Sequence, residues 1–186
     1  SPPNTSSAAS DVYKRQGAFD PNVAINVDAD VENVAINAAL NVTSVAINAN
    51  TGVSIGANVT TSGNQSYATG ISLTADAQLT GDNVTVGGGV SGAFALTLNG
   101  ATSVDVQGAV TTSSLSTQSA ASVDSINIAG DLTPGGGTLT VDTASAAVGG
   151  NADIDSAISV TSGSLSVTGT SAIGANVTTS LSLIHI

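Results

Sequence analysis

Residues 22–55 read NVAINVDADVENVAINAALNVTSVAINANTGVSI, and the repeat within this stretch decides the fold. The unit VAIN begins at Val23, Val34 and Val45, which are 11 residues apart. An 11-residue period can also mark a right-handed helical supercoil. From Val23 to Val31, however, every second residue is apolar, whereas a helix would place Asn26 and a carboxylate on its buried stripe. The pattern therefore predicts short strands with one apolar side.

Later segments keep this alternation and mostly end in Gly, Asn or Asp. They include NVTVGGG, FALTLNG, SVDVQGA and TLTVDTA. Gly tolerates a positive φ at a corner, and Asn and Asp bond to the local backbone, so these residues are expected to end strands. The two GGG runs, 87–89 and 135–137, are interpreted as corners and not as phosphate loops, because no Lys and no evident helix follows them.

Short strands with small inward side chains predict an all-β fold, a β-solenoid (parallel β-helix) in which each coil stacks on the next. Two 11-residue units are expected to make one coil of about 22 residues. Val106 and Ile128 are 22 residues apart and are expected to stack. The alternative is a tandem array of β-sandwiches. Sandwich cores usually contain large aromatic residues, and this chain has only 2 Tyr, 2 Phe and no Trp.

The two ends differ from the rest of the chain. Lys14 and Arg15, in DVYKRQ at 11–16, are the only Lys and Arg, and the only His is His185 in LSLIHI at 181–186. The codons GAT GTG TAT AAG AGA CAG encode DVYKRQ, and their reverse complement encodes LSLIHI. This DNA resembles a transposase mosaic end used in sequencing adapters, and SSAAS at 6–10 matches the adjoining adapter.

We therefore expect residues 1–16 to be adapter-derived or unassigned and disordered, and residues 181–186 to be adapter-derived. Residues 17–180 are the predicted β-solenoid repeat region, incomplete at both ends. The octapeptide IGANVTTS at 55–62 recurs at 173–180, and the chain contains no Met. The region is accordingly expected to be an internal piece of a longer reading frame.

Charge excludes several classes of partner. Of the 13 acidic residues only Asp11 lies outside residues 17–180, a region that has no basic residue. Affinity for phosphate rests on Lys and Arg, so neither nucleic acid nor an anionic membrane surface is an expected partner. Polar residues interrupt every apolar stretch far short of the roughly 18 residues of a membrane span, so no membrane insertion is expected.

The chain offers little for catalysis. Without Cys, Lys, Arg or His in residues 17–180, the usual nucleophile and base pairs cannot form, which leaves Ser, Thr, Tyr67 and carboxylates. We predict that the protein is not an enzyme. No catalytic, cofactor-binding or metal-binding residue is assigned, and no cofactor is expected.

Two sets of residues suggest sites but have simpler interpretations. Alternation places Asp28, Asp30 and Glu32 on the outward face of one strand, a ligand type suited to Ca²⁺, and Asp153 and Asp155 repeat the pattern. Because no calcium-binding loop motif is present, a solvated acidic face is preferred, and Ca²⁺ binding stays open. Five N-x-S/T triplets are interpreted as turn or strand residues and not as glycan acceptors. They begin at Asn41, Asn58, Asn64, Asn83 and Asn176.

The runs NVTVGGGVSGAFALTLNG and SINIAGDLTPGGGTLTVDT, with the duplicated IGANVTTS, resemble the repetitive β-helical regions of bacterial filamentous-haemagglutinin-like adhesins and autotransporters. The resemblance rests on composition and repeat style over residues 17–180. It implies a non-catalytic stalk or display surface in a large secreted protein at the bacterial cell surface. Implied partners are host or matrix glycans or proteins, and neighbouring coils of the full-length chain. The alternatives are a carbohydrate-active β-helix protein and a Ca²⁺-stiffened biofilm matrix protein.

Overall fold

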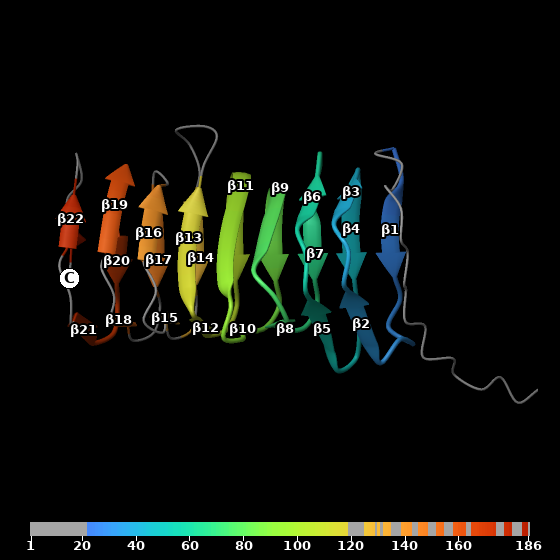
Figure 1. Cartoon of the computed structure of the whole chain (residues 1–186), viewed down its shortest axis with the longest axis horizontal. Helices are drawn as coiled ribbons and strands as arrows, with labels where there is room; N and C mark the ends of the chain where they lie inside the picture. Colours follow the sequence, from blue (N-terminus) through green and yellow to red (C-terminus); the bar gives the residue numbers. More distant parts are fainter. Residues whose placement is uncertain are drawn as a thin grey trace, which may run out of the picture.

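The computed structural model describes residues 22–118 and, beyond them, residues 125–128, 130, 132–134, 139–142, 145–148, 152–154, 158–162, 165–173, 177–179 and 184–185. Figure 1 shows strands side by side along the long axis, from the blue β1 (Ala24–Val27) to the red β22 (Val177–Thr179). Neighbouring strands pair in parallel throughout. The predicted β-solenoid is confirmed. The alternative of tandem β-sandwiches is wrong, because sandwich strands pair antiparallel.

Each coil passes through three faces, because an eight-stranded sheet and a bent 15-stranded sheet enclose a common interior. The first face contains β3 (Leu40–Val42), β6 (Val59–Thr61), the start of β9 (Ala77–Val86), the start of β11 (Ala95–Val106), β13 (Ser114–Gln118), β16 (Leu139–Asp142), β19 (Ile158–Ser162) and β22. The second face contains β1, β4 (Ser44–Ile47), β7 (Gln65–Tyr67), the ends of β9 and β11, β14 (Ser125–Ile128), β17 (Ser145–Val148), β20 (Leu165–Val167) and β23 (Ile184–His185). The third face is β2 (Asn33–Ile36), β5 (Gly52–Ile55), β8 (Ile71–Leu73), β10 (Val90–Ser91), β12 (Val110–Thr112), β15 (Leu132–Pro134), β18 (Ala152–Ile154) and β21 (Ser171–Ile173).

The strands β9 and β11 join the first two faces. β9 pairs with β6 through Leu79 and with β7 through Val84. Gly81 of β9 pairs with Gly100 of β11 between these two contacts, and the register shifts between Gly100 and Ser103. The bent sheet therefore carries one continuous strand around the corner in these two coils.

Coil length differs from the prediction. Paired residues in successive coils are mostly 19 or 20 positions apart, for example between β1 and β4 and between β2 and β5. The spacing falls to 18 between β5 and β8 and rises to 24 between β13 and β16. The predicted 22-residue coil is wrong as a general value, because a coil is made of three strands with turns of varying length and not of two 11-residue units. Val106 and Ile128 pair as predicted.

The VAIN units occupy different places in the coil. The first lies in β1 and the third in β4, both on the second face, whereas the second lies in β2 on the third face. Ile25 pairs with Val45, so the first and third units are two residues out of register. Val23 is 41% exposed.

The duplicated octapeptide adopts the same structure where both copies are described. Ile55 ends β5 and residues 59–61 form β6, whereas Ile173 ends β21 and residues 177–179 form β22. Both copies run from the third face to the first. Of the two end segments, only residues 184–185 are described, as β23, which pairs with β20. Their adapter origin stays a prediction.

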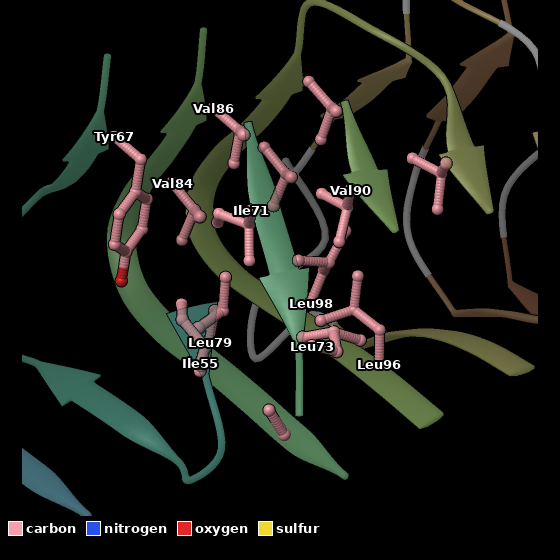
Figure 2. Packing of buried hydrophobic residues seen from close by; sticks show 14 of the residues in the cluster. Ile55, Tyr67, Ile71, Leu73, Leu79, Val84, Val86, Val90, Leu96 and Leu98 are labelled. Atoms are coloured by element: carbon pink, nitrogen blue, oxygen red, sulfur yellow. The ribbon is translucent and has the colours of Figure 1, made fainter. Parts of the chain in front are cut away.

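Aliphatic side chains fill the interior in columns that run from coil to coil. Val86 and Val106 pair on the second face, and neither has any exposed surface. Leu79 and Leu98 form the equivalent pair on the first face and are also fully buried. Figure 2 shows Leu79, Leu98 and Val86 pointing into the same interior as Ile71 of the third face. Burying one such side chain contributes about 1.5–3 kcal/mol, so the columns are the main source of stability.

Candidate functional surface

The acidic residues of the first coil do not share a strand. β1 ends one residue before Asp28, and Asp28, Asp30 and Glu32 lie exposed in the turn that leads to β2. The Asp28 carboxylate accepts a hydrogen bond from the Ala29 N–H at 3.1 Å, and its carbonyl accepts one from the Val31 N–H at 3.3 Å. The prediction of an outward strand face is therefore wrong, because Asp28 stabilises a turn where the alternating pattern continues.

No group of three His, Cys, Asp or Glu residues within the described part of the chain is arranged to hold a metal ion. Asp153 lies in β18, although its side chain is not among those described, and Asp155 lies outside the described residues.

Outward polar side chains form hydrogen-bonded ladders between coils. The Asn83 amide nitrogen donates to Asn64 Oδ1 at 2.9 Å, and Asn83 Oδ1 accepts from the Ser103 hydroxyl at 2.7 Å. Alongside, the Thr102 hydroxyl donates to Asp82 Oδ1 at 2.6 Å. These bonds link three successive coils across the corner between the first and second faces.

The N-x-S/T asparagines that the structure describes are strand or turn residues, as predicted. Asn41 lies in β3 and Asn83 in β9, whereas Asn58 and Asn64 lie in turns. Asn58 Oδ1 accepts a hydrogen bond from the Gln78 backbone N–H at 2.9 Å. The hydrogen bonds of Asn58, Asn64 and Asn83 give these three asparagines a structural role, and the absence of glycans stays a prediction. The fifth asparagine, at position 176, lies outside the described residues.

The glycines at 87–89 form a corner between β9 and β10, as predicted, but for a different reason. Among the described residues, only Gly92 has a positive φ, of 138°. At the corner a Cβ on Gly89 would lie 2.6 Å from the Ala109 carbonyl oxygen, and one on Gly70 would lie 2.9 Å from the Gly89 carbonyl oxygen. Close stacking of backbones, not backbone conformation, therefore requires glycine here. The second GGG run lies outside the described residues.

A shallow groove of about 420 Å³ crosses the third face. Gly52, Gly70 and Gly89 line it together with Ser72 and Ser91. These residues come from three successive coils, so the groove runs along the solenoid axis. No charged residue lines it.

A polar pair lies inside the aliphatic core, and sequence analysis did not identify it. Tyr67 is fully buried, and its hydroxyl donates to Gln65 Oε1 at 3.0 Å. The Gln65 amide nitrogen donates to the carbonyl oxygens of Val59 at 3.0 Å and Thr80 at 2.6 Å. Burial raises the pKa of Tyr67, so this hydroxyl is a neutral structural group and not an accessible nucleophile. The signal in the sequence is the alternation of QSY, which places Gln65 and Tyr67 on the same inward side.

No helix in the described part of the chain is long and apolar enough to cross a membrane. No family model, curated protein or solved structure matches the chain. The evidence for its class is therefore the solenoid itself: parallel coils, repeated sequence units and polar ladders on the outside.

Proposed function

We propose that this chain is a structural or adhesive repeat segment of a large secreted protein on the bacterial cell surface, and that it serves as a non-catalytic stalk or display surface. The observation that carries the proposal is the unbroken parallel stacking of strands from β1 to β23. In such a stack each coil contacts only its neighbours, so adding coils lengthens the rod without changing its cross-section. Length and stiffness are then the properties under selection.

The outer surface supports the same role. The Asn64–Asn83–Ser103 ladder ties coils together outside the core, while Asp82 and Asp105 each bond to a side chain of the next coil. Acidic charge without basic partners keeps such rods apart in solution at low salt. Proposed external partners are host or matrix glycans or proteins, which would meet the polar outer faces.

Surface exposure on the source cells tests the proposal. Long-read sequencing across both ends of the coding DNA would identify the genome, and antibodies against the purified chain would then be applied to intact and lysed cells. We expect labelling of intact cells that shaving with protease removes, and a reading frame that continues into further coils. Labelling only after lysis would overturn the proposal. Binding of the chain to a glycan and matrix-protein array would separate an adhesive segment from a passive stalk.

A further inference from the structure

The sequence of the first coil is compatible with a second strand register besides the observed one. In the observed register Ile25 pairs with Val45 and Val27 with Ile47, a spacing of 20 residues. If β1 advanced by two residues, Val23 would pair with Val45 and Ile25 with Ile47, so that one VAIN unit would lie directly on another. Because side chains alternate with a period of two, the shift leaves apolar residues inward and polar residues outward.

The backbone hydrogen bonds also have equivalents after the shift. Val27 and Val23 now use their carbonyls to accept from the N–H groups of Asn48 and Thr43, both at 2.9 Å. Carbonyls two residues apart on a strand point the same way. After the shift the Ile25 carbonyl would therefore replace that of Val27 as the acceptor for the Asn48 N–H. Each register thus packs two aliphatic side chains of β1 against the core, which are Ile25 and Val27, both partly buried, in the observed register, and keeps the same kind of ladder.

The rest of the molecule tolerates the coil that the shift would create. A 22-residue spacing already occurs between the paired Val104 and Ile126. The two extra residues would enter the turn at 28–32, whose side chains are exposed at Asp28, Asp30 and Glu32. Lengthening an exposed turn by two residues costs little loop-closure entropy.

We propose that β1 exchanges between these two registers, which makes the first coil a two-state joint in an otherwise single-register solenoid. The next coil lacks this degeneracy. There Val45 pairs with Gln65, whose amide is bonded to the carbonyls of Val59 and Thr80, and no VAIN unit is repeated. The proposal does not depend on the cell-surface function.

Disulfide trapping in the full chain tests the exchange, because the native sequence contains no Cys. The pair Ala24→Cys/Ser44→Cys reports the observed register and Ala24→Cys/Ala46→Cys the shifted one. A disulfide cannot bridge residues whose Cα atoms are more than about 7 Å apart, so each pair closes in its own register. In glutathione buffers we expect the shifted pair to close with an effective concentration within about 100-fold of the first pair, which corresponds to a minor state of about 1%.

Three controls make the result specific. Ala24→Cys/Asn48→Cys, four residues out of register, would close only if β1 were frayed, and Ala46→Cys/Ala68→Cys tests a shift in the next coil. Val23→Asp should lower closure of the shifted pair more than tenfold and leave the observed pair unchanged, since Val23 is 41% exposed in the observed register and would pack on Val45 only after the shift. Closure of the shifted pair no better than these two control pairs, or closure insensitive to Val23→Asp, would overturn the proposal.

Discussion

Two columns of stacked residues run through the same coils, one filled by large side chains and the other restricted to glycine. On the first face Leu79 and Leu98 stack inside the core with no exposed surface. At the corner between the second and third faces, Gly70 and Gly89 stack so closely that a Cβ on either would collide with backbone of the next coil. Strand spacing along the axis is about 4.8 Å in both places. The difference arises because side chains on the flat face point into the interior, whereas at the corner the Cβ position points at the adjacent coil.

Stability should depend most on the filled column. Leu98→Ala removes a fully buried side chain and leaves a cavity between coils, so we expect a loss of about 2–5 kcal/mol in the free energy of unfolding. Urea unfolding followed by circular dichroism would measure it. The matched control is Thr97→Ala, at the neighbouring half-exposed outward position. A loss below about 1 kcal/mol for Leu98→Ala would mean that the column can collapse around the gap.

The glycine column at the corner should be destabilised by added atoms, whereas the filled column is destabilised by their removal. Gly89→Ala places a methyl group 2.6 Å from the Ala109 carbonyl oxygen, and the resulting backbone shift should cost about 1–3 kcal/mol. Gly52→Ala is the control in the same column, because its Cβ would be 4.0 Å from its nearest neighbour, the Gly70 carbonyl oxygen. That variant should be neutral or gain about 0.5 kcal/mol. Equal effects at both positions would refute the steric explanation.

The buried polar pair lies on the second face, where Gln65 pairs with Val84 and Tyr67 with Val86, and it should behave as one unit. Tyr67→Phe leaves Gln65 Oε1 without its donor, so this variant should cost about 1 kcal/mol or more. Gln65→Leu leaves the Tyr67 hydroxyl without its acceptor and removes the amide bonds to the Val59 and Thr80 carbonyls, so it should cost at least as much. The double variant should cost less than the sum, with a coupling of at least about 0.5 kcal/mol, because the second change removes a group already orphaned. Strict additivity in thermal unfolding would show that the two side chains act separately.

The strands could be predicted from sequence because side chains alternate with a period of two, and the alternation in β1 is confirmed. The corner at 87–89 follows from its glycines and the stacking of Val106 on Ile128 from a 22-residue spacing that holds at this place, and both are confirmed. Coil length depends instead on how many turns interrupt the pattern, and the alternation continues through Asp28 and Asp30 although the chain turns there. The sequence shows the side chains but not the place where the strand stops.

The features of the surface and core that were missed depend on contacts between coils. The close approach of Gly89 to Ala109 and the bonds from Gln65 to Val59 and Thr80 join residues that are 6 to 20 positions apart. Such contacts follow only after the coil spacing is known, and this spacing varies between 18 and 24 residues. A prediction that assumes 22 residues would bring other residues together.

The smallest expected effect is a decrease in the free energy of unfolding at alkaline pH, caused by the buried Tyr67. The folded state holds Tyr67 neutral with a raised pKa, whereas the unfolded chain ionises tyrosine near pH 10. Above that pH the unfolded state binds fewer protons than the folded state, so the contribution of Tyr67 to stability, complete below pH 10, is lost as pH rises. The loss should be about 0.8 kcal/mol at about pH 10.5 and approach about 1.4 kcal/mol for each further pH unit. Tyr67→Phe should flatten this part of the stability curve while retaining the dependence due to all other groups, and parallel curves for the two proteins would show that the hydroxyl ionises as readily folded as unfolded.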